Sequence, residues 1–313
     1  PQAYIAALVN SYNAPAIHGN PHLDAIFAYT KGKHAAGESV WQAYWRRMKL
    51  LWQLRQMKFD FVLLASSGFA GRALKLAKLL APQHIVGFVT EQASSAKIDL
   101  AIPHGTGSKL HETADMYRLL EPLAILNEIP GLTVVADSAL AARLRQPLPA
   151  NVAHGSGPLV ALHISARKEK QRWPVERFAE LAQRLHAQHA ARFLVFWSPG
   201  DENNPFHPGD DGKAAHLLAA LADLPAALLR TEQLSELIAG LSLCDAAVLS
   251  DGGAMHVAAG LGKPLVCFFG NSSAERWHPW GVPHELLQKP SREVAEISVD
   301  EAVDAFARMM HRR

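Results

Sequence analysis

Short runs of apolar residues alternate along this chain with longer segments in which apolar residues recur at helical spacing. Such runs predict β-strands, and the periodic segments between them predict α-helices. Because the runs are apolar throughout rather than at every second position, they indicate parallel strands that are covered on both faces. In the first half we predict strands at residues 4–9, 24–29, 59–66, 84–89 and 132–137, and helices at about 38–57, 71–81 and 111–127.

A stretch rich in proline and glycine at residues 145–159 interrupts this alternation and is typical of a linker. A second series of elements follows it. Its strands are predicted at residues 159–165, 192–198, 226–230, 246–251, 264–270 and 285–288, and its helices at about 174–190, 211–222, 233–242, 254–261 and 299–312. Strand–helix alternation on both sides of a linker predicts an α/β protein of two doubly wound domains, residues 1–150 and 151–313.

The composition excludes several classes of protein. The chain has 313 residues, of which 49% are hydrophobic and 19% charged, and its formal net charge of +2 gives no reason to expect a nucleic-acid partner. Cys244 and Cys267 sit in or beside apolar runs and are expected to be buried thiols. No apolar run reaches the roughly 20 residues of a membrane-spanning helix, and no signal peptide is evident. Because the sequence opens at Pro1 without a Met, we expect that residues preceding Pro1 belong to the protein as well.

A cluster of polar and small residues lies between two apolar runs at residues 249–271, LSDGGAMHVAAGLGKPLVCFFGN. Asp251 is predicted at the end of a strand, Gly252 and Gly253 in a turn, and His256 in the first turn of a helix. Free N–H groups at a helix start favour a phosphate oxygen, and the Asp251 carboxylate suits sugar hydroxyls. The alternative is structural, with Asp251 as an N-cap and His256 as a core residue. The stretch matches neither a Walker A loop nor the Rossmann G-x-G-x-x-G.

Three segments together resemble glycosyltransferase family 9, the lipopolysaccharide heptosyltransferases. Residues 250–281, SDGGAMHVAAGLGKPLVCFFGNSSAERWHPWG, are similar to the carboxyl-terminal signature of that family. Residues 161–185 are similar to its strand, basic loop and helix opened by Trp-Pro, and residues 19–29, GNPHLDAIFAY, to its Asn-Pro-x-x-Asp segment. The signature residues present are Asp251, Gly252, Gly253, His256, Gly262, Pro264, Phe269, Gly270, Trp277 and Pro279.

The resemblance implies a GT-B fold, in which two Rossmann-like domains face each other across a cleft. It implies that the first domain takes the acceptor and the second the nucleotide sugar. The implied reaction moves a heptose, with inversion, from ADP-L-glycero-D-manno-heptose to the inner core of lipopolysaccharide, where Kdo or a heptose on lipid A accepts it. No metal and no cofactor are implied. We therefore expect a cytoplasmic monomer at the inner face of the inner membrane, with no nucleic-acid partner.

Inverting transfer needs a base at the acceptor hydroxyl and stabilisation of the leaving diphosphate. The predicted catalytic cations are Lys170 and Arg172, because the family places a basic residue shortly before its Trp-Pro. The spacing before Trp173 leaves Lys170, Gln171 and Arg172 open, with Arg167 as a further alternative. The predicted donor-binding residues are Ser165, Arg167, Asp201, Asp251, Gly252, Gly253 and His256.

The general base of the family, an Asp in a Gly-Asp-[Val/Ile]-Leu segment, has no counterpart in this sequence. We expect it before Pro1, in a first strand and helix that this sequence lacks. Asp24, Glu38 and Asp115 are other acids of the first domain, but nothing ties them to catalysis. Two alternatives stay open: a family member with another nucleotide sugar or acceptor, and a sugar-nucleotide-binding protein without catalytic activity.

Two helices are candidates for contact with the acceptor or its membrane. Residues 37–59 are rich in Trp and Arg, which suits stacking on sugars and pairing of Arg46, Arg47 and Lys49 with lipid A phosphates. The alternative is that these aromatic residues belong to the core. The basic end of the last helix, at residues 308–313, suits an anionic membrane surface, but we favour its interpretation as a solvated helix end.

Overall fold

The computed structural model describes residues 3–30, 40–90, 98–104, 109–203 and 209–312. The chain divides into two compact units. The larger unit comprises Pro1–Ile5, Asn13–Asp24 and Gly131–Arg313, and the smaller unit comprises Ala6–Tyr12 and Ala25–Pro130. The division follows residue 130 rather than residue 150, because Leu132, Val134 and Leu144 pack against the core of the larger unit.

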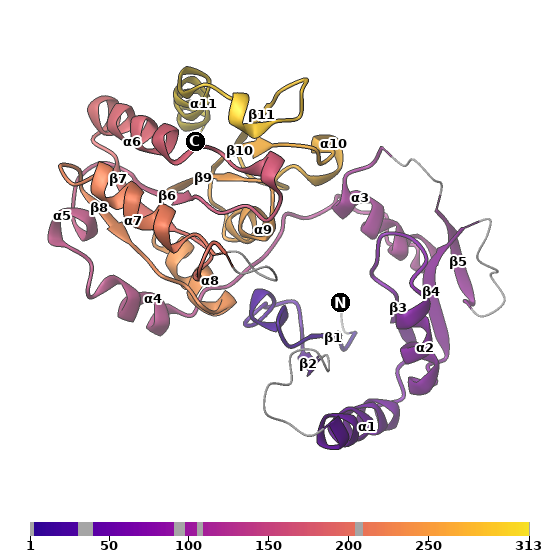
Figure 1. The fold of residues 1–313 in the computed structure, drawn as a ribbon. Coiled ribbons are helices and arrows are strands. Elements are labelled where there is room, and N and C mark those ends of the chain that lie inside the picture. Colours follow the sequence, from indigo (N-terminus) through magenta and orange to yellow (C-terminus); the bar gives the residue numbers. More distant parts are fainter. Residues whose placement is uncertain (1–2, 31–39, 91–97, 105–108, 204–208, 313) are drawn as a thin grey trace. The chain divides into compact units, whose positions relative to one another are not determined.

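The larger unit is built on a six-stranded sheet in which every strand runs parallel to its neighbours (Figure 1). The strands are β6 (Leu159–His163), β7 (Arg192–Phe196), β8 (Ala226–Leu228), β9 (Ala246–Ser250), β10 (Leu265–Phe269) and β11 (His284–Gln288). Their order is β11-β10-β9-β6-β7-β8. The chain winds outward from β6 to β8, returns to β9 beside β6, and winds the other way to β11. This order creates a topological switch point between β6 and β9.

Helices cover both faces of this sheet, as the uninterrupted apolar strands predict. One face is covered by α6 (Val175–His189), α7 (Asp211–Ala220) and α11 (Val299–His311). The other is covered by α4 (Ser138–Arg145), α5 (Ala150–Ala153), α8 (Leu234–Ser242) and α9 (Gly253–Gly260). The short helices of this unit are η1 (Ala14–Ala16), η4 (Glu169–Gln171), α10 (Ala274–Trp277) and η5 (Val294–Glu296).

Two segments of the larger unit differ from the prediction. Residues 145–159 are not a linker, because α5 lies within them and Val152 is fully buried in the core. Residues 132–137 do not form a strand. They run over α9 instead, where the Val134 N–H donates to the Gly260 carbonyl at 2.8 Å. The apolar residues at 132–137 pack on the core without joining a sheet, so they were mistaken for a strand. The Pro and Gly residues at 145–159 surround a short buried helix, so this segment was mistaken for a linker.

The smaller unit contains two parallel sheets. The first pairs β1 (Ala6–Asn10) with β2 (Ala25–Tyr29), and the second has the order β3 (Phe61–Leu63), β4 (His84–Val89), β5 (Leu100–Pro103). The helices are α1 (Val40–Gln56), α2 (Gly71–Leu80), α3 (Glu112–Tyr117) and η3 (Arg118–Leu123). Leu8 of β1 and Val62 of β3 pack in one cluster with Leu51 and Leu54 of α1, so one helical layer covers both sheets. The predicted helix at residues 111–127 is the pair α3 and η3.

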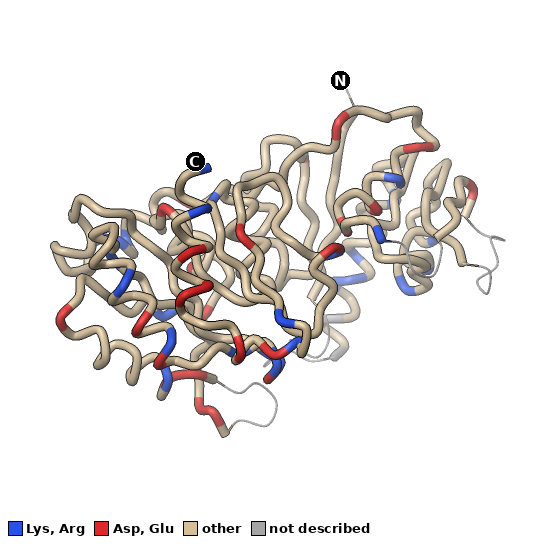
Figure 2. Tube along the Cα trace, turned by 90° about the horizontal axis from the view of Figure 1, so that it is seen from above, with Lys and Arg blue, Asp and Glu red and all other residues tan. Residues whose placement is uncertain are grey.

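The distribution of charged residues and the lengths of the helices add two observations. Figure 2 shows Lys and Arg interspersed with Asp and Glu along much of the trace. None of the helices within the described ranges has the length and apolar character needed to cross a bilayer.

Candidate functional site

The loops that carry the predicted site begin where β6 and β9 end. These neighbouring strands flank the switch point of the larger unit, so the loop after His163 and the loop after Ser250 start at the same edge of the sheet. Residues 165–172 and 251–253 therefore belong to one place in the fold, as the sequence predicts. Open α/β sheets bind their ligands at this place.

The helix α9 begins without a side-chain cap. Its N-cap residue is Gly252, which has no capping side chain, so the proposed role of Asp251 as N-cap is wrong. A Cβ atom built on Gly253 would meet no atom within 4 Å, and both glycines are exposed. The first N–H groups of α9 therefore border open space. Uncapped N–H groups at a helix start, with the helix dipole behind them, favour an anion.

Gln171 joins three loops at this edge of the sheet. Its side-chain Nε2 donates to Asp251 Oδ2 at 2.8 Å and to Ser272 Oγ at 2.8 Å. The side chain is only 5% exposed. A Cβ on Gly270 would lie 2.6 Å from the Lys170 carbonyl, so only glycine lets η4 approach β10 this closely. Gln171 thus fixes the Asp251 carboxylate beside the start of α9. The sequence named it only as one of three residues before Trp173.

Two basic residues of the same loop have partners other than Asp251. Lys170 Nζ lies 2.7 Å from Glu293 Oε1, and this hydrogen bond raises the pKa of Lys170 above its ordinary value. Arg172 Nε donates to the Ala166 carbonyl at 3.0 Å and so closes the loop on itself. Arg167 is exposed. The structure therefore does not bring Lys170 to Asp251; Glu293 holds it by a contact that sequence spacing could not reveal.

Two further predicted residues serve the backbone. The buried Ser165 Oγ accepts a hydrogen bond from the Ser198 N–H at 2.8 Å, which ties the ends of β6 and β7 together. The exposed Asp201 accepts from the Asn203 N–H and from Asn203 Nδ2, at 2.9 and 3.0 Å. The buried acid after β7 is Asp210, whose Oδ1 lies 2.5 Å from Lys213 Nζ. Asp210 was not among the predicted site residues, although its position just before a predicted helix was an available signal.

His256 and a polar pocket complete this edge of the sheet. The His256 ring packs edge-on against Trp277, with ring centroids 6.1 Å apart. Beyond β10 and β11 lies a pocket of about 400 Å³. It is lined by Asn271, Ser272, Ser273, Ala274, Glu275, Gln288 and Arg292. Ser272 lines this pocket and also accepts the hydrogen bond from Gln171, so one side chain links the pocket to the residue that holds Asp251.

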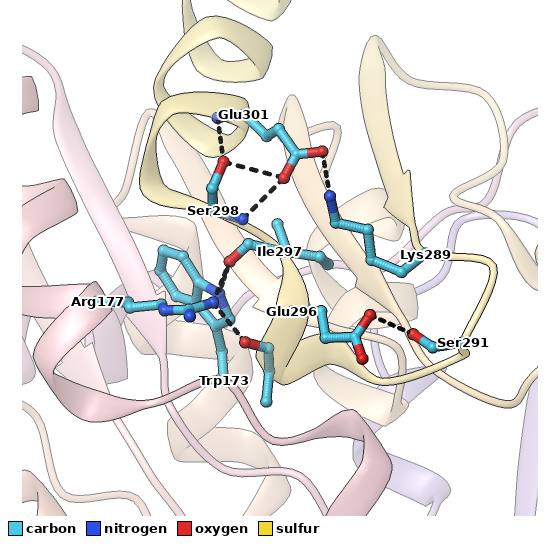
Figure 3. Close-up of polar contacts among 9 residues, drawn as sticks. Trp173, Arg177, Lys289, Ser291, Glu296, Ile297, Ser298 and Glu301 are labelled. Atoms are coloured by element: carbon cyan, nitrogen blue, oxygen red, sulfur yellow. Dashed lines mark hydrogen bonds and ion pairs between the residues drawn. The ribbon is translucent and has the colours of Figure 1, made fainter.

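The Trp-Pro motif has a structural role (Figure 3). The Trp173 indole N–H donates to the Ile297 carbonyl at 2.9 Å, and Arg177 donates to the same carbonyl at 2.5 Å. The next residue, Ser298, caps α11 in a capping box with Glu301. Lys289 Nζ lies 2.6 Å from Glu301 Oε1, and this hydrogen bond lowers the pKa of Glu301. The start of α6 and the start of α11 are therefore held together beside the predicted site.

His163 gives the end of β6 a dependence on pH. Burial lowers the pKa of His163 from 6.5 to about 4, against the opposing effects of backbone hydrogen bonds at residues 165 and 163 and of the Asp210 charge. The folded protein thus keeps this ring neutral down to about pH 4, whereas the unfolded chain protonates it near pH 6.5. Between these values the unfolded state binds more protons, so the free energy of unfolding falls as the pH falls.

We expect the titration of His163 to lower the free energy of unfolding by about 3 kcal/mol as the pH falls from 6.5 to 4. The measurement is urea unfolding at several pH values for the wild type and for His163→Gln, which has no titrating ring. The free energy of unfolding of the variant should fall less steeply below pH 6.5 than that of the wild type, because the other groups titrate equally in both proteins. Parallel curves for the two proteins would show that His163 is not responsible.

The acids of the first domain have structural partners. Asp115 is fully buried; its Oδ2 lies 2.8 Å from His104 Nε2 and its Oδ1 3.2 Å from Arg118 Nη1. Asp24 accepts a hydrogen bond from the Ile5 N–H at 2.7 Å. Glu38 lies outside the described residues. Within the described ranges, no group of three or more His, Cys, Asp or Glu side chains is placed to hold a metal ion.

Comparison with known families shows the family to which the chain belongs. The model of glycosyltransferase family 9 (heptosyltransferase) matches residues 47–302. The chain belongs to glycosyltransferase family 9. The family resemblance, the α/β fold of GT-B type and the enzyme class predicted from the sequence are thereby confirmed.

Curated relatives and solved structures agree with the family. Over 109 residues the chain is 34% identical to lipopolysaccharide heptosyltransferase 2 of Salmonella typhimurium and of Escherichia coli K12. That match covers 34% of this family 9 chain and only 28% of each relative. A family 9 glycosyl transferase from Veillonella parvula superposes with a TM-score of 0.75 at 17% identity, covering 99% of this chain and 89% of that one. The E. coli heptosyltransferase II and WaaC structures give 0.72 each, at 17% identity, covering 100% and 98% of this chain and 91% and 90% of theirs.

Proposed function

We propose that this family 9 protein transfers a heptose from ADP-L-glycero-D-manno-heptose to the inner core of lipopolysaccharide, with Kdo or a heptose as acceptor. The observation that carries the proposal is the uncapped start of α9 at the switch point, where Gly253 borders open space. The relatives add support, because the matched curated proteins are lipopolysaccharide heptosyltransferases. The E. coli heptosyltransferase WaaC has solved structures with ADP and with ADP-2-deoxy-2-fluoro heptose.

In this proposal the residues of the larger unit divide the work of binding the donor. The first N–H groups of α9 bind the diphosphate, whose negative charge grows as it leaves. Asp251, held by Gln171, accepts hydrogen bonds from sugar or ribose hydroxyls. Arg172 and Arg167 are the candidate cations of this loop, since Glu293 already pairs with Lys170. An Asp serves as the general base, and the transfer proceeds with inversion and without a metal ion or cofactor.

The proposed acceptor also suggests where the enzyme works in the cell. The lipid A acceptor places the enzyme at the inner face of the inner membrane, on the cytoplasmic side. We propose that it works there as a monomer, and that nucleic acid is no partner.

The direct test is to incubate the full-length protein with ADP-heptose and core-truncated lipopolysaccharide and to follow the release of ADP. Release that requires both substrates supports the proposal. A parallel panel of other nucleotide sugars distinguishes a different donor. Tight nucleotide binding without transfer to any core acceptor would indicate a binding protein instead.

Gln171→Met is expected to weaken ADP binding by about tenfold. Methionine keeps the volume of the side chain but donates no hydrogen bond, so Asp251 and Ser272 lose their shared partner. If Gln171 acts through Asp251, the effect should largely disappear when Asp251→Ala is already present. Calorimetric titration of ADP into the four proteins of this double-mutant cycle measures it. Equal losses in both backgrounds would show that Gln171 acts independently of Asp251.

A further inference from the structure

Large apolar side chains lie exposed along one side of α1, in the smaller unit. This aromatic stripe consists of Trp41 (73% exposed), Tyr44 (55%), Trp45 (69%), Met48 (37%) and Trp52 (64%). Their spacing places them on neighbouring turns of the helix. The inward side is carried by Leu51 and Leu54, which are 6% and 2% exposed. The interpretation of these aromatic residues as core is therefore wrong, and α1 has two separate apolar sides.

The helices that carry and adjoin the stripe are strongly basic. Residues 40–83 contain eight Lys and Arg but one acidic residue, Asp60, whereas the whole chain has a net charge of only +2. The rest of the chain is therefore net negative. Asp60 accepts a hydrogen bond from Gln83 Nε2 at 2.6 Å. The basic residues are Arg46, Arg47, Lys49, Arg55, Lys58, Arg72, Lys75 and Lys78.

Contacts within the unit fix this basic layer in place. Helices α1 and α2 pack against each other beside the sheets of the smaller unit (Figure 1). Arg55 Nη1 donates to the Leu79 carbonyl of α2 at 2.9 Å. The Arg47 guanidinium lies 5.7 Å from the centroid of the Tyr29 ring of β2. The helix that carries the stripe is therefore held in place by contacts with α2 and β2.

We propose that α1 docks the smaller unit onto an anionic lipid bilayer. Soluble monomers rarely expose a contiguous apolar surface of this kind, and Trp and Tyr side chains favour the headgroup level of a bilayer. An amphipathic helix with Trp on one side and Lys and Arg beside it suits the plane of the interface. The excess of cations complements lipid phosphates, and it would disfavour a basic partner. This inference concerns a different unit from the donor site and does not rest on the proposed reaction.

The experiment is flotation of the full-length protein with vesicles of phosphatidylglycerol and phosphatidylethanolamine, compared with phosphatidylcholine alone. We expect at least tenfold stronger partition to the anionic vesicles, and a decrease when the salt is raised from 0.1 to 0.5 M. The combined variant Trp41→Ser, Trp45→Ser, Trp52→Ser should lose at least tenfold in partition. It should also lose the quenching of Trp fluorescence by brominated lipids that the wild type shows.

A second variant, Arg46→Gln, Arg47→Gln, Lys49→Gln, tests the charges without touching the stripe and should lose both binding and its salt dependence. The matched control combines Leu126→Ser, which replaces an exposed apolar residue outside α1, with Arg143→Gln of α4. It should bind as the wild type does. Equal binding to both vesicle types, or unchanged binding by the Trp variant, would overturn the proposal. So would a dimer in sedimentation experiments that the Trp variant abolishes, because the stripe would then face a second copy.

Discussion

Gly253→Asp is expected to abolish nucleotide binding while leaving the protein folded. The position has room, since a Cβ there would meet no atom within 4 Å. A carboxylate in the first turn of α9 interacts favourably with the helix dipole, so the free energy of unfolding should stay equal or rise by about 0.3–1 kcal/mol. The same carboxylate would occupy the anion site and repel a diphosphate. We expect the affinity for ADP to fall at least 100-fold, which corresponds to about 3 kcal/mol.

The measurement combines calorimetric titration of ADP with thermal unfolding of the free protein. Gly253→Asn is the matched control, because it has nearly the same shape without the charge. Asn should weaken binding far less than Asp. If Gly253→Asp bound ADP as tightly as the wild type, the start of α9 would not be the diphosphate site. A large loss of stability in both variants would instead show that the loop requires glycine for its backbone.

The sheet of the larger unit could be predicted because its strands are apolar throughout. The run at residues 246–251 becomes β9 and the run at 264–270 becomes β10, each within a residue or two of its predicted ends. Strands buried on both faces carry their signal in every residue. A weaker signal was missed: β5 (Leu100–Pro103) was not predicted, because it has only four residues and ends in a proline, which disfavours a strand.

The positions of the predicted site residues in the fold could be predicted, but the hydrogen bonds around them could not. Asp251, Gly252 and Gly253 follow a strand and open a helix, and local sequence is enough to show this. The choice among Lys170, Gln171 and Arg172 depends on residues far along the chain: Asp251 and Ser272 receive hydrogen bonds from Gln171, and Glu293 pairs with Lys170. Long-range contacts of single side chains leave no periodic pattern.

The contacts that Lys170 and Arg172 make in the structure could not be predicted from their charge. A run of basic residues before a helix predicts cations for a diphosphate, and for Arg172 and Arg167 this stays a prediction. In the structure Arg172 donates to the backbone of its own loop, and the residue whose side chain reaches the Asp251 loop is the neutral, buried Gln171.

Trp173→Ala is expected to destabilise the larger unit by about 3–5 kcal/mol, the usual cost of removing a large aromatic side chain from a core. Trp173 is 4% exposed, and its ring lies 4.8 Å from that of Phe178 and 4.6 Å from that of Phe268. Its indole N–H also bonds the Ile297 carbonyl, which helps to hold the start of α11. Since Trp173 directly follows the loop of Gln171, the cavity should also loosen the donor site.

Trp173→Phe separates the two contributions of this side chain. Phenylalanine keeps much of the ring packing but lacks the N–H donor, and Arg177 continues to donate to the Ile297 carbonyl. The loss should therefore be smaller, with about 1 kcal/mol for the hydrogen bond and a further part for the missing ring volume. Urea unfolding followed by circular dichroism, with ADP affinity measured on each folded variant, gives both quantities. If Trp173→Phe cost as much as Trp173→Ala, the hydrogen bond to Ile297, rather than ring packing, would be what holds the Trp-Pro turn against the start of α11.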